Sequence, residues 1–277
     1  MKDMGRIACK TVREKHDMSK VAVITGGSRG LGLSLARCVA REGFTPILLA
    51  RDMDALEEAV AEIANMGSQA VSYAVDITDE TAMGDVAGDI AGRFGTVDFL
   101  INNAGILHTD IIEDMTITDI RYDLEVCLFG TILSTRLCIP MMEKGGRILF
   151  ISSGFGLMGP AGYSVYAAAK AGMINFADAI RRELHARKIG VHVAVPSDID
   201  TPGLKKELAG LPAWMKVSQA RGKIQSPDDA ARRILQKCSG NRFLIFTDPG
   251  VRMLHMVNKL LPHRLRDVIL DMMFPRP

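Results

Sequence analysis

Residues 147–170 read RILFISSGFGLMGPAGYSVYAAAK and combine a strand, a loop and a helix. Arg147–Ser152 is a short apolar run bounded by glycines, which is typical of a buried strand. A loop rich in glycine and proline follows Ser153, and a helix of small residues then carries Tyr166 and Lys170. The stretch therefore predicts a strand that delivers a serine beside a helix bearing a tyrosine and a lysine.

Tyr166 and Lys170 are spaced i, i+4, which places their side chains on one helix face about a turn apart. A phenol has a reference pKa near ~10, and a neighbouring ammonium favours the phenolate, so we expect Lys170 to lower the pKa of Tyr166. Ser153 would hydrogen-bond a carbonyl oxygen beside the phenol. The three residues together predict a site that exchanges a proton with a carbonyl or alcohol oxygen. A tyrosine–lysine pair alone arises by chance on many helices, and the specificity lies in the whole arrangement.

The composition limits the class of protein. The 277 residues are 48% hydrophobic and 24% charged, as in soluble globular proteins, and an α/β chain of this length is commonly one domain. A formal net charge of +2 argues against a large nucleic-acid-binding surface. The five cysteines are scattered and never spaced C-x-x-C, so we expect reduced thiols in a cytoplasmic protein, with no metal site.

Val21–Thr25 is followed directly by a glycine-rich turn at residues 26–32 and then by a stretch of helical composition. Strand, glycine turn and helix N-terminus form a layout that binds a pyrophosphate, because glycines let the backbone approach the phosphates and free N–H groups meet their charge. The spacing is G-x-x-x-G-x-G rather than G-x-G-x-x-G. The sequence therefore predicts a dinucleotide site that includes Gly26, Gly30 and Gly32.

The end of the second predicted strand, Pro46–Ala50, indicates which dinucleotide binds. Folds that bind NAD place an acid there for the ribose 2′-hydroxyl, whereas here an alanine takes that place and Arg51 follows. Arg29 in the glycine turn adds a second cation, and two guanidinium groups favour a 2′-phosphate, hence NADPH. The alternative for the neighbouring Asp52 is to cap the helix Met53–Met66 without any cofactor role.

Strand-like and helix-like runs alternate along the rest of the chain and predict a doubly wound α/β fold with a mostly parallel, seven-stranded, Rossmann-like sheet. Asp76 follows the third strand and is placed to accept from an adenine amino group. Asn103 follows the fourth, where its amide would tie strand ends together or simply belong to a loop. Residues 111–142 read as one long helix or two. The predicted strands are Val21–Thr25, Pro46–Ala50, Val71–Val75, Val97–Ile101, Arg147–Ser152, Gly190–Pro196 and Arg242–Phe246.

Beyond the seventh strand, the tail predicts two amphipathic helices, one ending at Leu260 and one over His263–Phe274. Basic amphipathic helices lie on membrane surfaces, and the alternative is a subunit-packing or substrate-lid helix. The nearby cations are Arg252, Lys259, Arg264 and Arg266. The chain therefore divides into a flexible arm at 1–17, with Met18 as an alternative start residue, a catalytic domain at 18–247 and a helical extension at 248–277.

These motifs resemble those of the short-chain dehydrogenase/reductase family. Along residues 21–246 the chain has, in order, T-G-x-x-x-G-x-G, N-N-A-G, a strand-end serine, Y-x-x-x-K and a P-x-x-x-x-T loop. The resemblance implies that Ser153 orients a carbonyl, that Tyr166 is the acid/base and that Lys170 holds the nicotinamide ribose. The cofactor contacts it implies are Gly26, Ser28, Arg29, Gly30, Gly32, Arg51, Asp76, Asn103, Tyr166, Lys170 and Thr201.

Within the family, the loop D-I-D-T-P-G at residues 198–203 is similar to that of 3-ketodihydrosphingosine reductases, as are Ala50-Arg51 and the tail. The chain also departs from the family pattern. Ser197 replaces a usual glycine, and Cys127 stands where an asparagine normally completes a catalytic tetrad. We expect this thiol to behave as a small apolar residue that cannot replace both halves of an amide.

The resemblance implies an NADPH-dependent reductase of a lipophilic ketone such as 3-ketodihydrosphingosine. We expect a homodimer or homotetramer, and the amphipathic tail predicts a peripheral membrane contact. The first alternative is the same chemistry on a steroid, polyketide or acyl carbonyl. The second is a dinucleotide-sensing protein that has lost catalysis. Cys127 keeps this last alternative open, and the intact serine, tyrosine and lysine argue against it.

Overall fold

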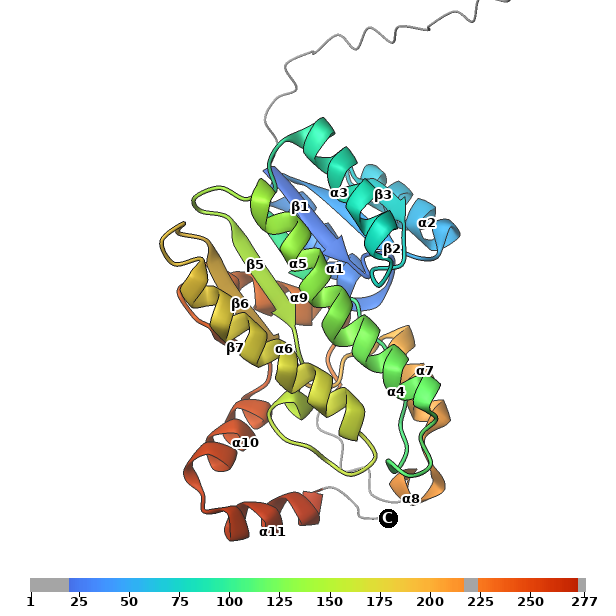
Figure 1. Ribbon diagram of the computed structural model, residues 1–277, viewed down its shortest axis with the longest axis vertical. Coiled ribbons are helices and arrows are strands. Elements are labelled where there is room, and N and C mark those ends of the chain that lie inside the picture. Colours follow the sequence, from blue (N-terminus) through green and yellow to red (C-terminus); the bar gives the residue numbers. More distant parts are fainter. Residues whose placement is uncertain (1–19, 217–223, 274–277) are drawn as a thin grey trace, which may run out of the picture.

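A seven-stranded parallel sheet forms the centre of the molecule in the computed structural model, which describes residues 20–216 and 224–273 (Figure 1). The strand order is β3-β2-β1-β4-β5-β6-β7, and every neighbouring pair is parallel. The order reverses between β1 and β4, the switch point beyond which α/β sheets bind their ligands. The predicted doubly wound α/β fold is confirmed. The strands are β1 Lys20–Thr25, β2 Phe44–Ala50, β3 Val71–Ala74, β4 Phe99–Asn102, β5 Arg147–Ile151, β6 Gly190–Val195 and β7 Leu244–Phe246.

Helices cover both faces of the sheet, which is why most strands are apolar along their whole length. α3, α5 and α6 contribute to one cluster of buried side chains, and α1, α2 and α9 contribute to a second cluster on the opposite face (Figure 1). The helices are α1 Gly30–Arg41, α2 Met53–Asn65, α3 Glu80–Phe94, α4 Ile117–Leu124, α5 Gly130–Cys138, α6 Ser164–Glu183, α7 Pro202–Gly210, α8 Ala213–Lys216, α9 Pro227–Cys238, α10 Pro249–Leu260 and α11 His263–Met273.

The fourth strand begins two residues later than predicted. Val97 does not pair with a strand, because its N–H donates to the carbonyl of Met141 at 3.0 Å. The side chain of Asp98 accepts the N–H of Val21 at 2.8 Å and closes this end of the sheet. β4 therefore runs over Phe99–Asn102, and Asn103 is the first residue beyond it.

The predicted helix at 111–142 is one continuous helical stretch over Ile117–Met141. α4 passes into a π-helical segment at Glu125–Phe129, then into α5 and a final 3₁₀ turn. By length and mean hydropathy (1.4) it is the one helix within the described residues that could cross a membrane, yet 44% of its most apolar window is buried. A Cβ on Gly130 would lie 2.6 Å from Ile77 Cδ1, so the helix packs closely against the β3–α3 loop. This helical stretch therefore packs one side against the core of the domain.

The tail forms the two predicted helices, α10 and α11, which lie beyond the carboxyl ends of the strands in Figure 1. The inner face of α10 contacts the loop that follows β5. Asn258 Nδ2 donates to the carbonyl of Leu157 at 2.6 Å, and Val251 packs against the core beside Gly154. The predicted arm at 1–17 and Met18 lie outside the described residues.

Candidate active site

The glycine turn joins β1 to α1 with a backbone that other residues would disturb. Gly26 and Gly30 have φ values of +64° and +56°, in the left-handed region that favours glycine. A Cβ on Gly32 would lie 2.0 Å from the carbonyl oxygen of Gly26, so no side chain fits there. The N-cap of α1, Arg29, makes no side-chain cap bond, and the first turn carries no acid. The N–H groups at this helix end are therefore suited to an anion.

Asn103 ties β1 to β4 behind the glycine turn, as predicted. Its Nδ2 donates to the carbonyls of Thr25 and Gly26, both at 3.1 Å. In return, Thr25 Oγ1 accepts the backbone N–H groups of Asn103 and Ala104 at 3.0 and 3.1 Å. The amide thus fixes the position of the turn, and its direct contact with an adenosine stays a prediction. Ser28 lies half-buried in the same turn.

The two arginines predicted for a 2′-phosphate lie at this end of the sheet, and each already has a carboxylate beside it. Arg29 pairs with Asp52 at 2.6 Å, and Asp52 also caps α2 by accepting from the N–H of Ala55. Arg51 donates to the hydroxyl of Tyr122 and lies 3.8 Å from Asp76. The helix-capping alternative for Asp52 is confirmed.

Asp76 and Thr201 take up local roles that also bring them to the site. Asp76 Oδ1 accepts from the N–H and the hydroxyl of Thr78 at 2.9 and 2.8 Å, which closes its own turn after β3. Thr201 caps α7 by accepting the N–H of Leu204 at 3.2 Å. A Cβ on Gly30 would lie 3.1 Å from Thr201 Cγ2, so the loop before α7 rests on the glycine turn.

The structure brings Ser153, Tyr166 and Lys170 together at the carboxyl end of β5. The Ser153 side chain lies close enough to the phenol of Tyr166 to favour its ionised form, although burial outweighs this effect and raises the pKa of Tyr166. The Lys170 ammonium lies 5.5 Å from the centre of the Tyr166 ring and donates to the carbonyl of Ile151 at 2.9 Å. α6 places the tyrosine and the lysine one turn apart, as their spacing predicted.

The expected lowering of the Tyr166 pKa by Lys170 is not found. Burial raises the pKa of Tyr166 and lowers the pKa of Lys170, because withdrawal from water disfavours the charged form of each. The lysine bonds a backbone carbonyl rather than the phenol oxygen, so it does not offset this effect. Tyr166 is therefore held as a protonated phenol, the form that donates a proton.

Cys127 lies in the π-helical segment and contacts both polar groups of one backbone residue. Its Sγ donates to the carbonyl of Ile106 at 3.1 Å and accepts the N–H of the same residue at 3.4 Å. Burial raises the pKa of this thiol, which keeps it neutral. The expectation that a thiol here would only fill space is wrong, because the sulfur reaches a donor and an acceptor, although both bonds are weak.

An apolar cluster borders the catalytic residues, and its membership was not predicted. Tyr163, one turn before Tyr166 on α6, packs with Leu211 and Met215, and its hydroxyl donates to Glu207 at 2.8 Å. The partly buried residues around this cluster are Leu107, Phe155, Leu208 and Trp214. The segment from 204 onward has no sequence periodicity that points to the site, so only the fold brings it there.

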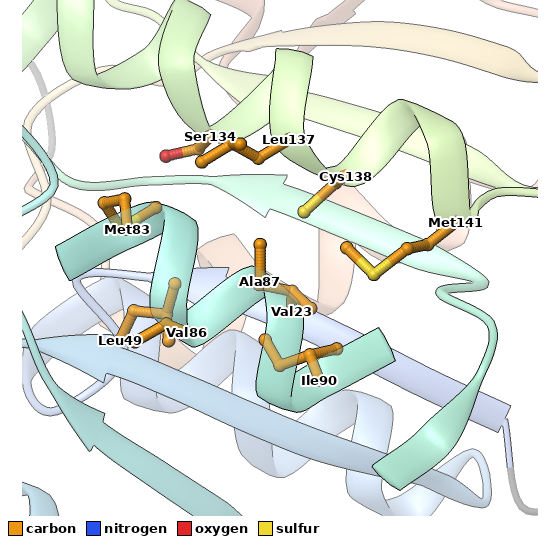
Figure 2. Close-up of a pocket in the computed structure, with 10 residues that line it drawn as sticks. All are labelled: Val23, Leu49, Met83, Val86, Ala87, Ile90, Ser134, Leu137, Cys138 and Met141. Atoms are coloured by element: carbon orange, nitrogen blue, oxygen red, sulfur yellow. The ribbon is translucent and has the colours of Figure 1, made fainter. Parts of the chain in front are cut away.

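Figure 2 shows a small apolar cavity between α3 and α5, within the core. Met83 and Ile90 line it from α3, Cys138 from α5 and Val23 from β1. No predicted site residue borders this cavity, and burial raises the pKa of the Cys138 thiol to about 12. It is a gap in packing rather than a reaction site. Within 20–216 and 224–273, no three histidine, cysteine or acidic side chains are grouped to hold a metal ion.

A glycine turn at the switch point, beside a serine, a tyrosine and a lysine, defines a dinucleotide-dependent oxidoreductase. Comparisons with known proteins agree. Residues 20–211 match the family model for short chain dehydrogenases. Carbonyl reductase family member 4 of Xenopus tropicalis is 31% identical over 223 residues, which cover 79% of this chain and 90% of that protein. The 3-oxoacyl-[acyl-carrier-protein] reductase of Synechocystis sp. is 32% identical over 235 residues, covering 84% and 91%.

A solved structure shares the fold as well. A short chain dehydrogenase from Burkholderia cenocepacia, crystallised in complex with NADP, matches with a TM-score of 0.74 and 28% identity over 84% of this chain and 98% of that one. The chain belongs to the short-chain dehydrogenase family of oxidoreductases. These two relatives are a carbonyl reductase and a 3-oxoacyl reductase. A substrate such as 3-ketodihydrosphingosine therefore stays a prediction.

Proposed function

We propose that this protein uses NADPH to reduce a lipophilic ketone to a secondary alcohol. The observation that carries the proposal is the meeting of Ser153, Tyr166 and Lys170 beside an apolar cluster, across from the glycine turn. A carbonyl oxygen that accepts from the serine hydroxyl and the phenol lies where Tyr166 can protonate it.

The glycine turn fits a dinucleotide. α1 begins with uncapped N–H groups, and Gly32 leaves no room for a side chain where the backbone must approach a pyrophosphate. NADPH supplies the hydride for the carbonyl carbon. The NADP complex of the Burkholderia cenocepacia relative supports the choice of cofactor. The residues proposed to hold it are Gly26, Ser28, Arg29, Gly30, Gly32, Arg51, Asp76, Asn103, Tyr166, Lys170 and Thr201.

The chain's own residues handle the proton. The buried Tyr166 keeps its proton at neutral pH and gives it up only when negative charge develops on the carbonyl oxygen. Lys170, 5.5 Å from the centre of the phenol ring, is the residue proposed to hold the nicotinamide ribose beside Tyr166. Ser153 keeps the carbonyl oxygen beside the phenol, which restricts the reaction to one orientation.

A lipophilic 3-keto substrate is the finer part of the proposal. The partly buried residues around Tyr163 offer an apolar surface that suits an alkyl chain, and they are Leu107, Phe155, Leu208 and Trp214. The similarity to a 3-oxoacyl reductase supports a 3-keto group. The loop at 198–203 supports a long-chain substrate such as 3-ketodihydrosphingosine, and an acyl or steroid ketone is the alternative.

The tail supports a peripheral membrane contact for a protein that is otherwise cytoplasmic. Met253, Met256 and Leu260 are 66%, 50% and 72% exposed on the outer side of α10, and Leu265 and Val268 are exposed on α11. Exposed cations lie among them, so an acidic lipid surface suits this face. The extension at 248–277 is proposed as a unit distinct from the catalytic domain at 18–247. The assembly is proposed to be a homodimer or homotetramer.

An assay of NADPH oxidation across 3-ketones of rising chain length tests the proposal. Turnover should rise with chain length and should nearly vanish in the Tyr166→Phe variant. NADPH binding without reduction of any ketone in the series would instead favour a dinucleotide-sensing protein. Equal turnover of short and long ketones would support a reductase but contradict the preference for a lipophilic substrate.

A further inference from the structure

Asp123 is a fully buried acidic side chain on α4, and the proposed chemistry gives it no role. Its Oδ2 accepts the backbone N–H of His108 at 3.0 Å, and its Oδ1 lies 2.7 Å from Nδ1 of the His108 ring. The other ring nitrogen lies 3.6 Å from the more exposed Asp119. Burying a carboxyl group is costly unless it is hydrogen-bonded. This pair therefore fixes the loop to the helix.

The same loop is held by Cys127, one turn further along the same helical stretch. Cys127 contacts the backbone of Ile106, and Asp123 contacts the residue two positions later. Between these contacts and β4, the loop backbone passes the catalytic lysine. A Cβ on Gly105 would lie 3.5 Å from Lys170 Nζ and 3.7 Å from the cysteine sulfur. A shift of this loop would therefore change the packing around the Lys170 ammonium.

The two anchors differ in strength. A thiol is a weak donor and acceptor, and its two bonds here are 3.1 and 3.4 Å long. The carboxyl group of Asp123 makes two shorter contacts, and bonds to a carboxylate are the stronger kind. We propose that Asp123, acting through His108, is a positioning residue of the catalytic centre. It holds the loop against Lys170, where the two bonds made by Cys127 are weak.

The charge of Asp123 also reaches the phenol. Burial is the main cause that raises the pKa of Tyr166, and negative charge at Asp123 raises it further. Because Tyr166 must be protonated to donate, the reduction rate falls as pH rises through its pKa. Removal of the Asp123 charge therefore takes away one of the smaller contributions that raise the pKa of Tyr166. The other groups that face Tyr166 are Cys127, Glu207, Ser153 and Lys170.

The first test compares Asp123→Asn with Asp119→Asn, the same substitution one turn earlier on α4. With NADPH and a medium-chain 3-keto ester, Asp123→Asn should lower kcat about tenfold, the scale of a small misplacement of catalytic groups. KM for NADPH should stay within about twofold, because the glycine turn is untouched. Asp119→Asn keeps an acceptor for Thr116 and for the second ring nitrogen of His108, so it should change neither quantity.

Hydrogen exchange in the protein alone gives a readout independent of turnover. The backbone N–H of His108 should exchange about tenfold faster in Asp123→Asn than in the parent, because its acceptor loses charge. Cys127→Asn supplies a stronger anchor to Ile106 and should restore about fivefold of the kcat lost in Asp123→Asn. Equal effects of Cys127→Asn in both backgrounds would show that the two anchors do not share a task.

The positioning role rests on the catalytic roles proposed for Tyr166 and Lys170. The experiments distinguish a failure of the positioning role from a failure of the proposed function. An inactive parent overturns the proposed function, while hydrogen exchange at His108 still decides whether Asp123 holds the loop. An active parent in which Asp123→Asn behaves like Asp119→Asn overturns the positioning role alone. If Asp123→Asn does not fold, His108→Ala carries the same test from a partly exposed position, with His108→Gln as the conservative rescue.

Discussion

The surroundings of Tyr166 and Lys170 disfavour the charged form of each side chain, which bears on the step in which the phenol gives up its proton. Burial holds the phenol in its protonated form and opposes the charge on the lysine. A protonated phenol is ready to act as the acid in reduction, whereas oxidation of an alcohol would need the phenolate first. The geometry therefore suits a reductase in the absence of other charge.

Tyr166→Phe should reduce turnover by about 10²–10⁴-fold, the usual contribution of a general acid. The substitution keeps the ring beside Lys170 and removes only the hydroxyl group that carries the proton. NADPH affinity should stay close to that of the parent in a fluorescence titration. Retention of more than about a tenth of the parental kcat would place the acid elsewhere.

Cys127→Asn should change turnover by less than about tenfold, or 1.4 kcal/mol. The sulfur already contacts the carbonyl and the N–H of Ile106, and an amide at this position would contact the same two groups more strongly. Steady-state kinetics against Cys127→Ser provides the comparison. An inactive parent that Cys127→Asn makes active would contradict this expectation and support the sensor alternative.

We propose that cofactor choice depends on Arg51 and Arg29, and we expect a clear preference for NADPH over NADH. Each charged hydrogen bond to a 2′-phosphate is worth about 1.5–3 kcal/mol, and Arg51→Ala should weaken NADPH binding by that amount without affecting NADH. Titrations with both cofactors measure the difference. Arg41→Ala, at the far end of α1, is the matched control and should leave both affinities unchanged. Equal affinity of the parent for the two cofactors would refute the preference.

At the scale of elements, the patterns that the sequence reveals are local ones. β1, the glycine turn and α1 follow one another within residues 20–41, so their order and composition were enough to predict them. The pair Arg51–Tyr122 and the pair His108–Asp123 each join segments that only packing brings together. The π-helical segment that aims Cys127 at Ile106 has no periodic signal either.

Gly32→Ala tests whether the glycine turn requires a residue without a side chain at position 32. The added Cβ would lie 2.0 Å from a backbone oxygen, so the turn must shift and NADPH binding should be lost, with a lower Tm. Gly84→Ala in α3 is the control, because nothing lies within 4 Å of its added Cβ. This second change should raise stability by about 0.5–1 kcal/mol, through the helix propensity of alanine. Undiminished cofactor binding by Gly32→Ala would mean that the phosphates lie elsewhere.

For the whole molecule, the question is how the tail contributes to a site built almost entirely before it. α10 has two different faces. The inner one holds the loop after Ser153 through Asn258 and Leu157, and the outer one exposes apolar side chains. The first face links the tail to the catalytic loop, and the second suits a lipid surface or the chain of a lipophilic substrate.

Deletion of residues 251–277 should spare NADPH binding and impair the reduction of long-chain ketones, because the proposed dinucleotide site lies at β1 and β4 while α10 supports the loop at Leu157. Deletion of residues 261–277 is the matched control, since it removes α11 and keeps the bond between Asn258 and Leu157. If only the exposed apolar surface matters, the shorter deletion should lower long-chain turnover less than the longer one, because it keeps Met253, Met256 and Leu260, and both should keep short-chain turnover. If support of the loop matters, the longer deletion alone should also lower kcat on short ketones by about tenfold. Full activity of the longer deletion on ketones of every length would show that the tail has neither role.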